Sequence, residues 1–176
     1  TTLAFDIFGT VLDLSGSLIT PTGRFLTARD AAIDAPTFWE QWRARQRIEQ
    51  YQDSLLMLGH SGYLETCRRA LVYCLRDQGV AFTPGEVDEF MRVWHELSPY
   101  DDAEEGLALL GKRYRLVALS NGDEWYLERL AKERIEADFD TIISVDRAGA
   151  FKPHPAVYRT AARGLGCEPH EIMMVA

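Results

Sequence analysis

The stretch LAFDIFGTVLD, residues 3–13, decides the fold of this chain. Its first three residues are apolar, lead directly to Asp6, and are followed by a turn at Gly9 and Thr10. In an α/β protein this pattern predicts a buried strand that ends at the carboxyl edge of a parallel sheet, where active sites collect. An aspartate fixed there can be a covalent nucleophile, or it can simply cap the turn. The rest of the chain favours the nucleophile.

The composition is typical of a globular protein, with 176 residues, 47% hydrophobic and 26% charged. That length allows one good core, or a core and a small second domain. The net charge of −8, without a block of Lys and Arg, argues against a nucleic-acid partner. No apolar run approaches the ~20 residues that span a bilayer, and no signal peptide is recognisable, so we expect no membrane partner.

The three cysteines, Cys67, Cys74 and Cys167, show no spacing typical of a metal site or a redox motif. Cys67 and Cys74 lie seven residues apart, on one face of a predicted helix, which suits core packing. We therefore expect reduced, buried thiols in a cytoplasmic protein. None of the four histidines has a partner at metal-ligand spacing, and His154 and His170 are expected in loops. The sequence thus predicts no metal and no other cofactor.

A helical block follows the first strand, which we expect at residues 3–7. From about 36 to 97 the apolar residues recur with helical period. Capping boxes at Thr37–Glu40 and Thr83–Glu86 are expected to open two of its helices. The first of these carries Trp42, Ile48 and Leu55, and the second runs to Leu97, before Pro99.

After Pro99 the pattern alternates between helices and short apolar strands. Helices are expected at about 103–110, 124–137 and 155–165, and strands at 116–119, 141–145 and 172–175. This alternation predicts βαβ units and a parallel sheet. The predicted fold is therefore α/β, a Rossmann-like core of residues 1–14 and 98–176 with a helical cap, residues 15–97, inserted after the first strand. Such an insertion is placed to act as a lid; a domain with only a packing role is the alternative.

The predicted strand ends deliver polar side chains to one edge of the sheet. Asp6 and Thr10 follow the first strand, Ser120 and Asn121 follow the second, and the third leads to Asp146 and on to Lys152.

Three motifs in this order resemble the haloacid dehalogenase superfamily: FDIFGTVLD (5–13), LSNGD (119–123) and FKPHPAVY (151–158). Within it they are similar to the L-2-haloacid dehalogenases, and the resemblance covers essentially the whole chain. It implies the fold of that superfamily, with its Rossmann-like core and cap domain. It also implies (S)-2-haloacid dehalogenase activity, in which a short L-2-haloalkanoate becomes a 2-hydroxyalkanoate with inversion, through an ester on Asp6. The substrate would be a small haloacid, and no metal is needed.

Phe8 separates this chemistry from phosphoryl transfer. The superfamily's phosphatases carry a second Asp two residues after the nucleophile, which protonates the leaving alkoxide. A phenyl ring cannot donate a proton, whereas a halide leaves as a stable anion and needs none. The dehalogenases often have Tyr at this position, so Phe8 lacks one hydrogen bond.

The resemblance also assigns roles to further residues. Lys152 matches the lysine that pairs with the nucleophile, and Thr10 and Ser120 match hydroxyls that hold the nucleophile and the substrate carboxylate. Asn121 and Arg43, the latter within QWRARQ (41–46), match the halide-binding pair. Tyr158 matches a tyrosine near the site, although core packing explains it nearly as well.

The superfamily's fourth motif, with an acidic residue that braces Lys152, would begin where this sequence stops, at Ala176. We therefore expect an incomplete chain, and poor solubility and no turnover from residues 1–176 alone. Opening of a strained ring by Asp6, a phosphatase, and a non-catalytic binding protein on this scaffold remain alternatives. Halide release from small haloacids separates them. The family is often dimeric, so a homodimer also stays open.

Overall fold

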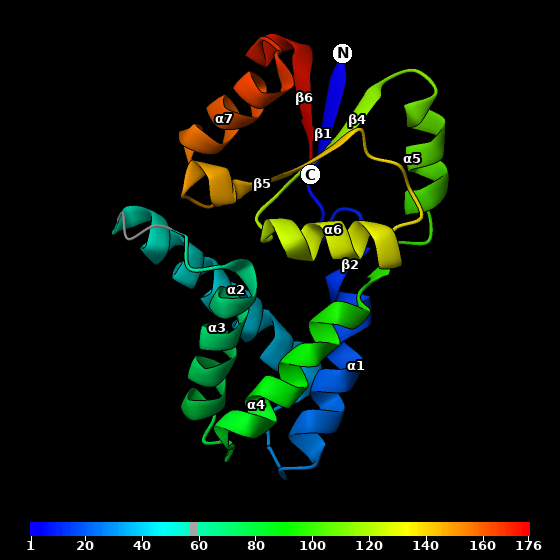
Figure 1. Cartoon of the computed structure of the whole chain (residues 1–176). Helices are drawn as coiled ribbons and strands as arrows, with labels where there is room; N and C mark the ends of the chain where they lie inside the picture. The colour runs from blue at the N-terminus through cyan, green and yellow to red at the C-terminus, as the bar shows by residue number, and fades with distance from the viewer. Residues whose placement is uncertain (57–59) are drawn as a thin grey trace.

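The computed structural model describes residues 1–56 and 60–176, and its centre is a parallel sheet of four strands in the order β5-β4-β1-β6 (Figure 1). All of β1 is buried, between β4 and β6. Such burial fits the apolar run at residues 3–5, since helices cover both faces of a parallel sheet. The predicted parallel sheet is confirmed. Its strands are β1 (Thr2–Phe5), β4 (Arg115–Ser120), β5 (Thr141–Ser144) and β6 (Ile172–Val175).

Two separate apolar clusters lie on the two faces of the sheet. Leu3 and Phe5 pack with residues of α5 and α6, whereas Ala4 packs with residues of α7. The alternation follows from the period of two of a β-strand. The helices are α5 (Ala103–Gly111), α6 (Glu124–Glu133) and α7 (Pro155–Leu165), with short 3-10 turns η2 (Val145–Ala148) and η3 (Pro169–Glu171).

A helical block lies beyond one edge of the sheet, in the lower half of Figure 1. A short antiparallel ribbon of β2 (Leu12–Asp13) and β3 (Ser98–Pro99) marks where the chain leaves the core and returns. The block consists of α1 (Leu14–Thr27), α2 (Ala35–Leu55), α3 (Tyr63–Asp77), α4 (Pro84–Phe90) and the 3-10 helix η1 (Met91–Glu96). Residues 57–59 of the expected block lie outside the described residues.

Helix ends differ from the sequence prediction at several points. The capping box at Thr37 is wrong: Asp34 caps α2 and accepts a hydrogen bond from the Thr37 N–H at 2.9 Å. The capping box at Thr83 is confirmed. The helix expected to reach Leu97 changes to 3-10 geometry at Met91, which lets the chain enter β3. The helix after β4 ends at Glu133 rather than 137, because the chain turns there to bury Ile135.

Of the three apolar residues that the sequence analysis names on α2, only one is buried. Trp42 is fully buried, but Ile48 is 45% exposed and Leu55 is 80% exposed. Polar side chains, including Gln46 and Gln50, occupy the buried face instead. No described helix has the length and apolar character that crossing a membrane requires.

Tryptophans hold the helical block together. Trp42 lies edge-on against Trp39 and Trp94, with ring centroids 5.7 Å apart in both pairs. Its indole N–H donates to the carbonyl oxygen of Cys67 on α3 at 2.7 Å. One side chain therefore ties α2 to both α3 and η1.

We predict that Trp42→Ala lowers the free energy of unfolding by about 3–5 kcal/mol, because it leaves a large cavity and removes the hydrogen bond to Cys67. Ile48→Ala, six residues further along the same helix, should change it by less than about 1 kcal/mol, since its side chain is largely exposed. Chemical denaturation of both variants measures the difference. Equal losses of unfolding free energy in the two variants would contradict the role of Trp42 in holding the block together.

Candidate active site

Asp6 stands at the carboxyl end of β1, where a tight turn begins. Its backbone N–H donates to Val175 at 2.8 Å, which extends the pairing of β1 with β6 by one residue. The next residues wrap around the Ile7 carbonyl, which accepts hydrogen bonds from the N–H groups of Val11 and Leu12. Gly9 has a φ of 93°, a backbone conformation that residues with a side chain rarely adopt. The turn therefore fixes the Asp6 side chain at the sheet edge.

The two oxygens of the Asp6 carboxylate have different surroundings. Oδ1 accepts from the Ile7 N–H at 2.7 Å and the Ser120 hydroxyl at 3.2 Å, and it lies 3.0 Å from Lys152 Nζ. None of the described hydrogen bonds or ion pairs goes to Oδ2, and the side chain is 24% exposed. One oxygen is thus held from three directions, while no described hydrogen bond or ion pair holds the other.

Lys152 arrives from the loop after β5, and its side chain is only 10% exposed. Its ammonium group donates to the carbonyl oxygen of Leu119 at 2.7 Å, in addition to its contact with Asp6. Burial lowers the pKa of Lys152, and the charge of Asp6 opposes that shift. The end of β4 thus helps to hold the ammonium group against the carboxylate.

Asn121 joins the lysine loop to the helical block. Its Oδ1 accepts from the backbone N–H of Lys152 at 2.7 Å, and its Nδ2 donates to Gln50 Oε1 at 3.4 Å. Gln50 lies on the buried face of α2. The motif sequence identified Asn121, but nothing in the sequence singled out Gln50, since a glutamine on a helix is usually exposed.

Arg43 lies on the same helix and faces the site. Its guanidinium donates to Gln46 Oε1 and to the Tyr63 hydroxyl. Burial acts against its charge, but Tyr63, Cys67 and Asp6 together outweigh burial and raise the pKa of Arg43. Phe8 lies beneath, stacked on Tyr63 with ring centroids 4.1 Å apart and an interplanar angle of 10°. Aromatic rings and a cation therefore form one wall beside the carboxylate.

Thr10 and Tyr158 differ from Ser120 and Lys152 in their relation to Asp6. No hydrogen bond joins either side chain to Asp6 in the structure. Tyr158 is 39% exposed, and its pKa is raised by burial and by the charge of Asp6.

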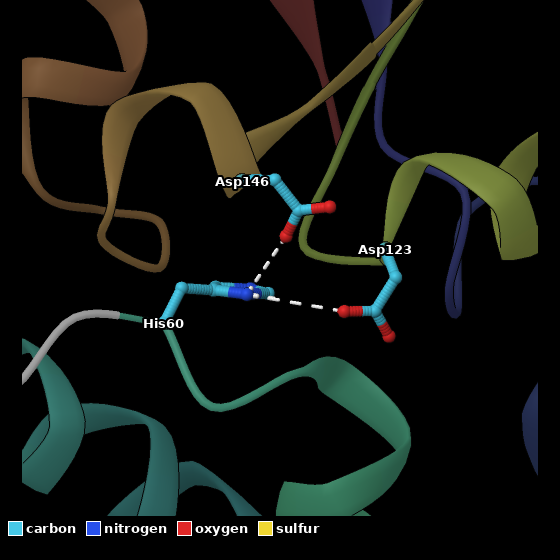
Figure 2. Close-up of side chains that lie close together, drawn as sticks. All are labelled: His60, Asp123 and Asp146. Atoms are coloured by element: carbon cyan, nitrogen blue, oxygen red, sulfur yellow. Dashed lines mark ion pairs between the residues drawn. The ribbon is translucent and has the colours of Figure 1, made fainter.

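A second polar cluster, missed by the sequence analysis, lies between the block and the core (Figure 2). His60, from the segment before α3, has Nδ1 2.8 Å from Asp146 and 3.9 Å from Asp123. Asp123 also accepts from the backbone N–H of Tyr63 at 3.1 Å, and burial raises its pKa. The three residues offer ligand atoms within 4.8 Å of one another, a spacing that suits a metal ion. Because Nδ1 already pairs with Asp146, we interpret the cluster as a contact that joins the block to the core.

Comparison with known proteins agrees with this geometry. A model of the haloacid dehalogenase-like hydrolases matches residues 1–175. The chain is 30% identical to (S)-2-haloacid dehalogenase 4A of Burkholderia cepacia, over 98% of this chain and 72% of that protein.

Solved structures agree as well. A defluorinating L-2-haloacid dehalogenase superposes with a TM-score of 0.86 at 31% identity, over 98% of this chain and 71% of that one. The L-2-haloacid dehalogenase of Xanthobacter autotrophicus with chloropropionic acid covalently bound superposes with a TM-score of 0.81 at 26% identity. The match covers 98% of this chain and 68% of that one. The parallel-sheet fold, the strand-end aspartate and these matches define the class of the protein, which is a hydrolase. The chain belongs to the haloacid dehalogenase-like hydrolase family.

We predict that Lys152 titrates below the pKa of a free lysine, and that Asp6→Asn lowers this pKa further by removing the charge that favours the ammonium form. The pKa of Lys152 in the wild type and in Asp6→Asn is measured by carbon-13 NMR of the lysine ε-methylene groups. Because the pKa of Lys152 is lower in the folded protein than in the unfolded chain, the unfolded chain binds more protons between these two pKa values. The contribution of Lys152 to stability should therefore rise with pH from the folded pKa to the unfolded one. A higher pKa in Asp6→Asn would contradict the described pairing.

Proposed function

We propose that this protein is an (S)-2-haloacid dehalogenase that hydrolyses short L-2-haloalkanoates to 2-hydroxyalkanoates through an ester on Asp6. The observation that carries the proposal is the divided environment of the carboxylate. Oδ1 is fixed by Lys152, Ser120 and the Ile7 N–H, and Oδ2 is left open. The named relatives and the covalently bound chloropropionic acid of the Xanthobacter structure support the same chemistry.

In the first step Oδ2 of Asp6 attacks the halogen-bearing carbon from the side opposite the halogen. The new C–O bond forms as the carbon–halogen bond breaks, the halide leaves with the bonding electron pair, and the carbon is inverted. Arg43 and Asn121 are placed to receive the halide. Backbone N–H groups of the turn can hold the substrate carboxylate, since the one hydroxyl hydrogen of Ser120 is donated to Asp6. Holding carboxylate and carbon together in line supplies much of the rate.

In the second step water attacks the ester carbonyl of Asp6. The ester bond breaks, the 2-hydroxyalkanoate leaves, and the carboxylate is restored with release of one proton. Lys152 stabilises the carboxylate form that returns, because its ammonium group stays beside Oδ1. The oxygen that reaches the product in the first turnover therefore comes from Asp6 rather than directly from water.

The helical block, residues 15–97, serves as a lid in this proposal. Arg43 and Gln50 come from it, so they belong to the site only when α2 packs on the core edge. Closure removes water from around Arg43 and strengthens its attraction for a leaving anion.

We further propose a cytoplasmic homodimer. The three free cysteines support the compartment. The exposed apolar side chains of Ile48, Tyr51 and Leu55 on α2 support the pairing of two copies.

We predict that Asp6→Asn abolishes halide release from 2-chloropropanoate, because an amide is not a nucleophile at neutral pH. Asp13→Asn is the matched control. Asp13 is the last residue of β2 and caps α1 through Gly16, and asparagine caps equally well. Halide release is measured with an ion-selective electrode in the full gene product. Release by Asp6→Asn at the rate of the control would reject Asp6 as nucleophile.

Metal removal gives a separate prediction. Dialysis against EDTA should leave halide release unchanged, since backbone donors hold the substrate carboxylate and Arg43 the halide, without a metal ion. Phe8 provides no proton for an alkoxide, so aryl phosphates should be poor substrates. Loss of halide release in EDTA would contradict the metal-free reaction, and preference for an aryl phosphate would support the phosphatase alternative.

A further inference from the structure

Two glutamines on α2 are buried where the lid faces the core. Gln46 is 1% exposed and Gln50 is 6% exposed, and they lie about one helical turn apart on the same face. A buried amide is unfavourable unless its polar atoms form hydrogen bonds. Their Oε1 atoms accept hydrogen bonds from Arg43 and Asn121, respectively. These are the two residues that bind the leaving halide in the proposed function.

Gln50 determines the orientation of the Asn121 amide. At one end of that amide, Oδ1 accepts from the Lys152 N–H at 2.7 Å; at the other, Nδ2 donates to Gln50 Oε1 at 3.4 Å. Because Nδ2 carries two hydrogens, one of them remains for a further acceptor. With both ends held, that remaining N–H has a fixed direction.

A neighbouring contact docks α2 at the same place. Ser54, one turn beyond Gln50, accepts a hydrogen bond from the Phe151 N–H at 3.2 Å, directly before Lys152 in the chain. Gln50 and Ser54 thus hold the lid against the two segments that carry Asn121 and Lys152. The position of Gln50 depends on this docking, so the alignment of Asn121 does too.

We propose that Gln50 is a positioning residue, which aligns the Asn121 amide for the leaving halide when the lid is closed. The proposal rests on the proposed function and goes one step beyond it. Gln46 stands in the corresponding relation to Arg43, and its own Nε2 is held by Cys67 Sγ at 2.7 Å. Each half of the halide-binding pair is therefore supported by a glutamine of the lid.

The size of the effect depends on the leaving group. A hydrogen-bond donor that is aligned in advance stabilises the charge that develops on the halide in the transition state. Chloride is a poorer leaving group than bromide and relies more on that donor. Loss of the alignment should therefore slow cleavage of a C–Cl bond more than cleavage of a C–Br bond, whereas general damage to the protein slows both equally.

The test compares Gln50→Met with Gln52→Met in the full gene product. Methionine keeps the length and volume of glutamine but lacks the acceptor oxygen, and Gln52 is exposed on the same helix. kcat/KM is measured for 2-chloropropanoate and 2-bromopropanoate, since it reports the steps up to carbon–halogen cleavage. We expect Gln50→Met to lose about tenfold with the chloro substrate, the order of one hydrogen bond to a charged group, and clearly less with the bromo substrate. Gln52→Met should match the wild type on both.

The ratio of the two kcat/KM values does not depend on how much of the sample is folded, so reduced stability cannot imitate the result. Gln50→Asn, one methylene too short to reach Asn121, should show the same chloride-selective loss. An unchanged ratio in both variants would overturn the positioning role of Gln50. Absence of halide release from the wild type would instead overturn the proposed function, so the two failures are distinguishable.

Discussion

The pairing of Asp6 with Lys152 is the constraint on which the site depends. A lysine with a side chain only 10% exposed is costly to keep charged. The structure offsets this cost with a carboxylate at 3.0 Å and a backbone carbonyl at 2.7 Å. These partners come from β1 and from the end of β4, and Lys152 itself follows β5. The strand order β5-β4-β1 brings the three together, so the topology of the sheet serves the ion pair directly.

The same constraint explains the unusual character of α2. A helix that covers a charged sheet edge cannot present only apolar side chains there, because the polar groups beneath would lose their partners. Its inner face accordingly carries Arg43, Gln46 and Gln50, while Ile48 and Leu55 turn outward. The block is held by its own tryptophan cluster and contacts the core through hydrogen bonds, such as that of Ser54 with Phe151. The hydrogen bonds across the edge thus add to an apolar contact, the stacking of Tyr63 on Phe8.

The sequence predicted what depends on local patterns. The strand before Asp6, the alternation after Pro99 and the polar strand ends are all found, because apolar runs and turn residues specify them within a few positions. The meeting of Asp6, Ser120 and Lys152 also followed, since carboxyl ends of parallel strands share one edge. The contacts of α2 did not follow: Ile48 and Leu55 are apolar yet exposed, and no local signal distinguishes a buried Gln50 from an exposed Gln52. The grouping of His60 with Asp123 and Asp146 also depends on three distant segments, which spacing along the chain cannot reveal.

The central claim is that a covalent ester forms on Asp6, and the source of the product oxygen tests it most directly. A single turnover of 2-chloropropanoate in heavy-oxygen water, with enzyme in excess, is followed by mass spectrometry of the peptide that contains Asp6 and of the 2-hydroxypropanoate. The account predicts that the Asp6 peptide gains one heavy oxygen while the product hydroxyl carries ordinary oxygen, because water attacks the ester carbonyl. Heavy oxygen in the product hydroxyl, with the Asp6 peptide unlabelled, would contradict it.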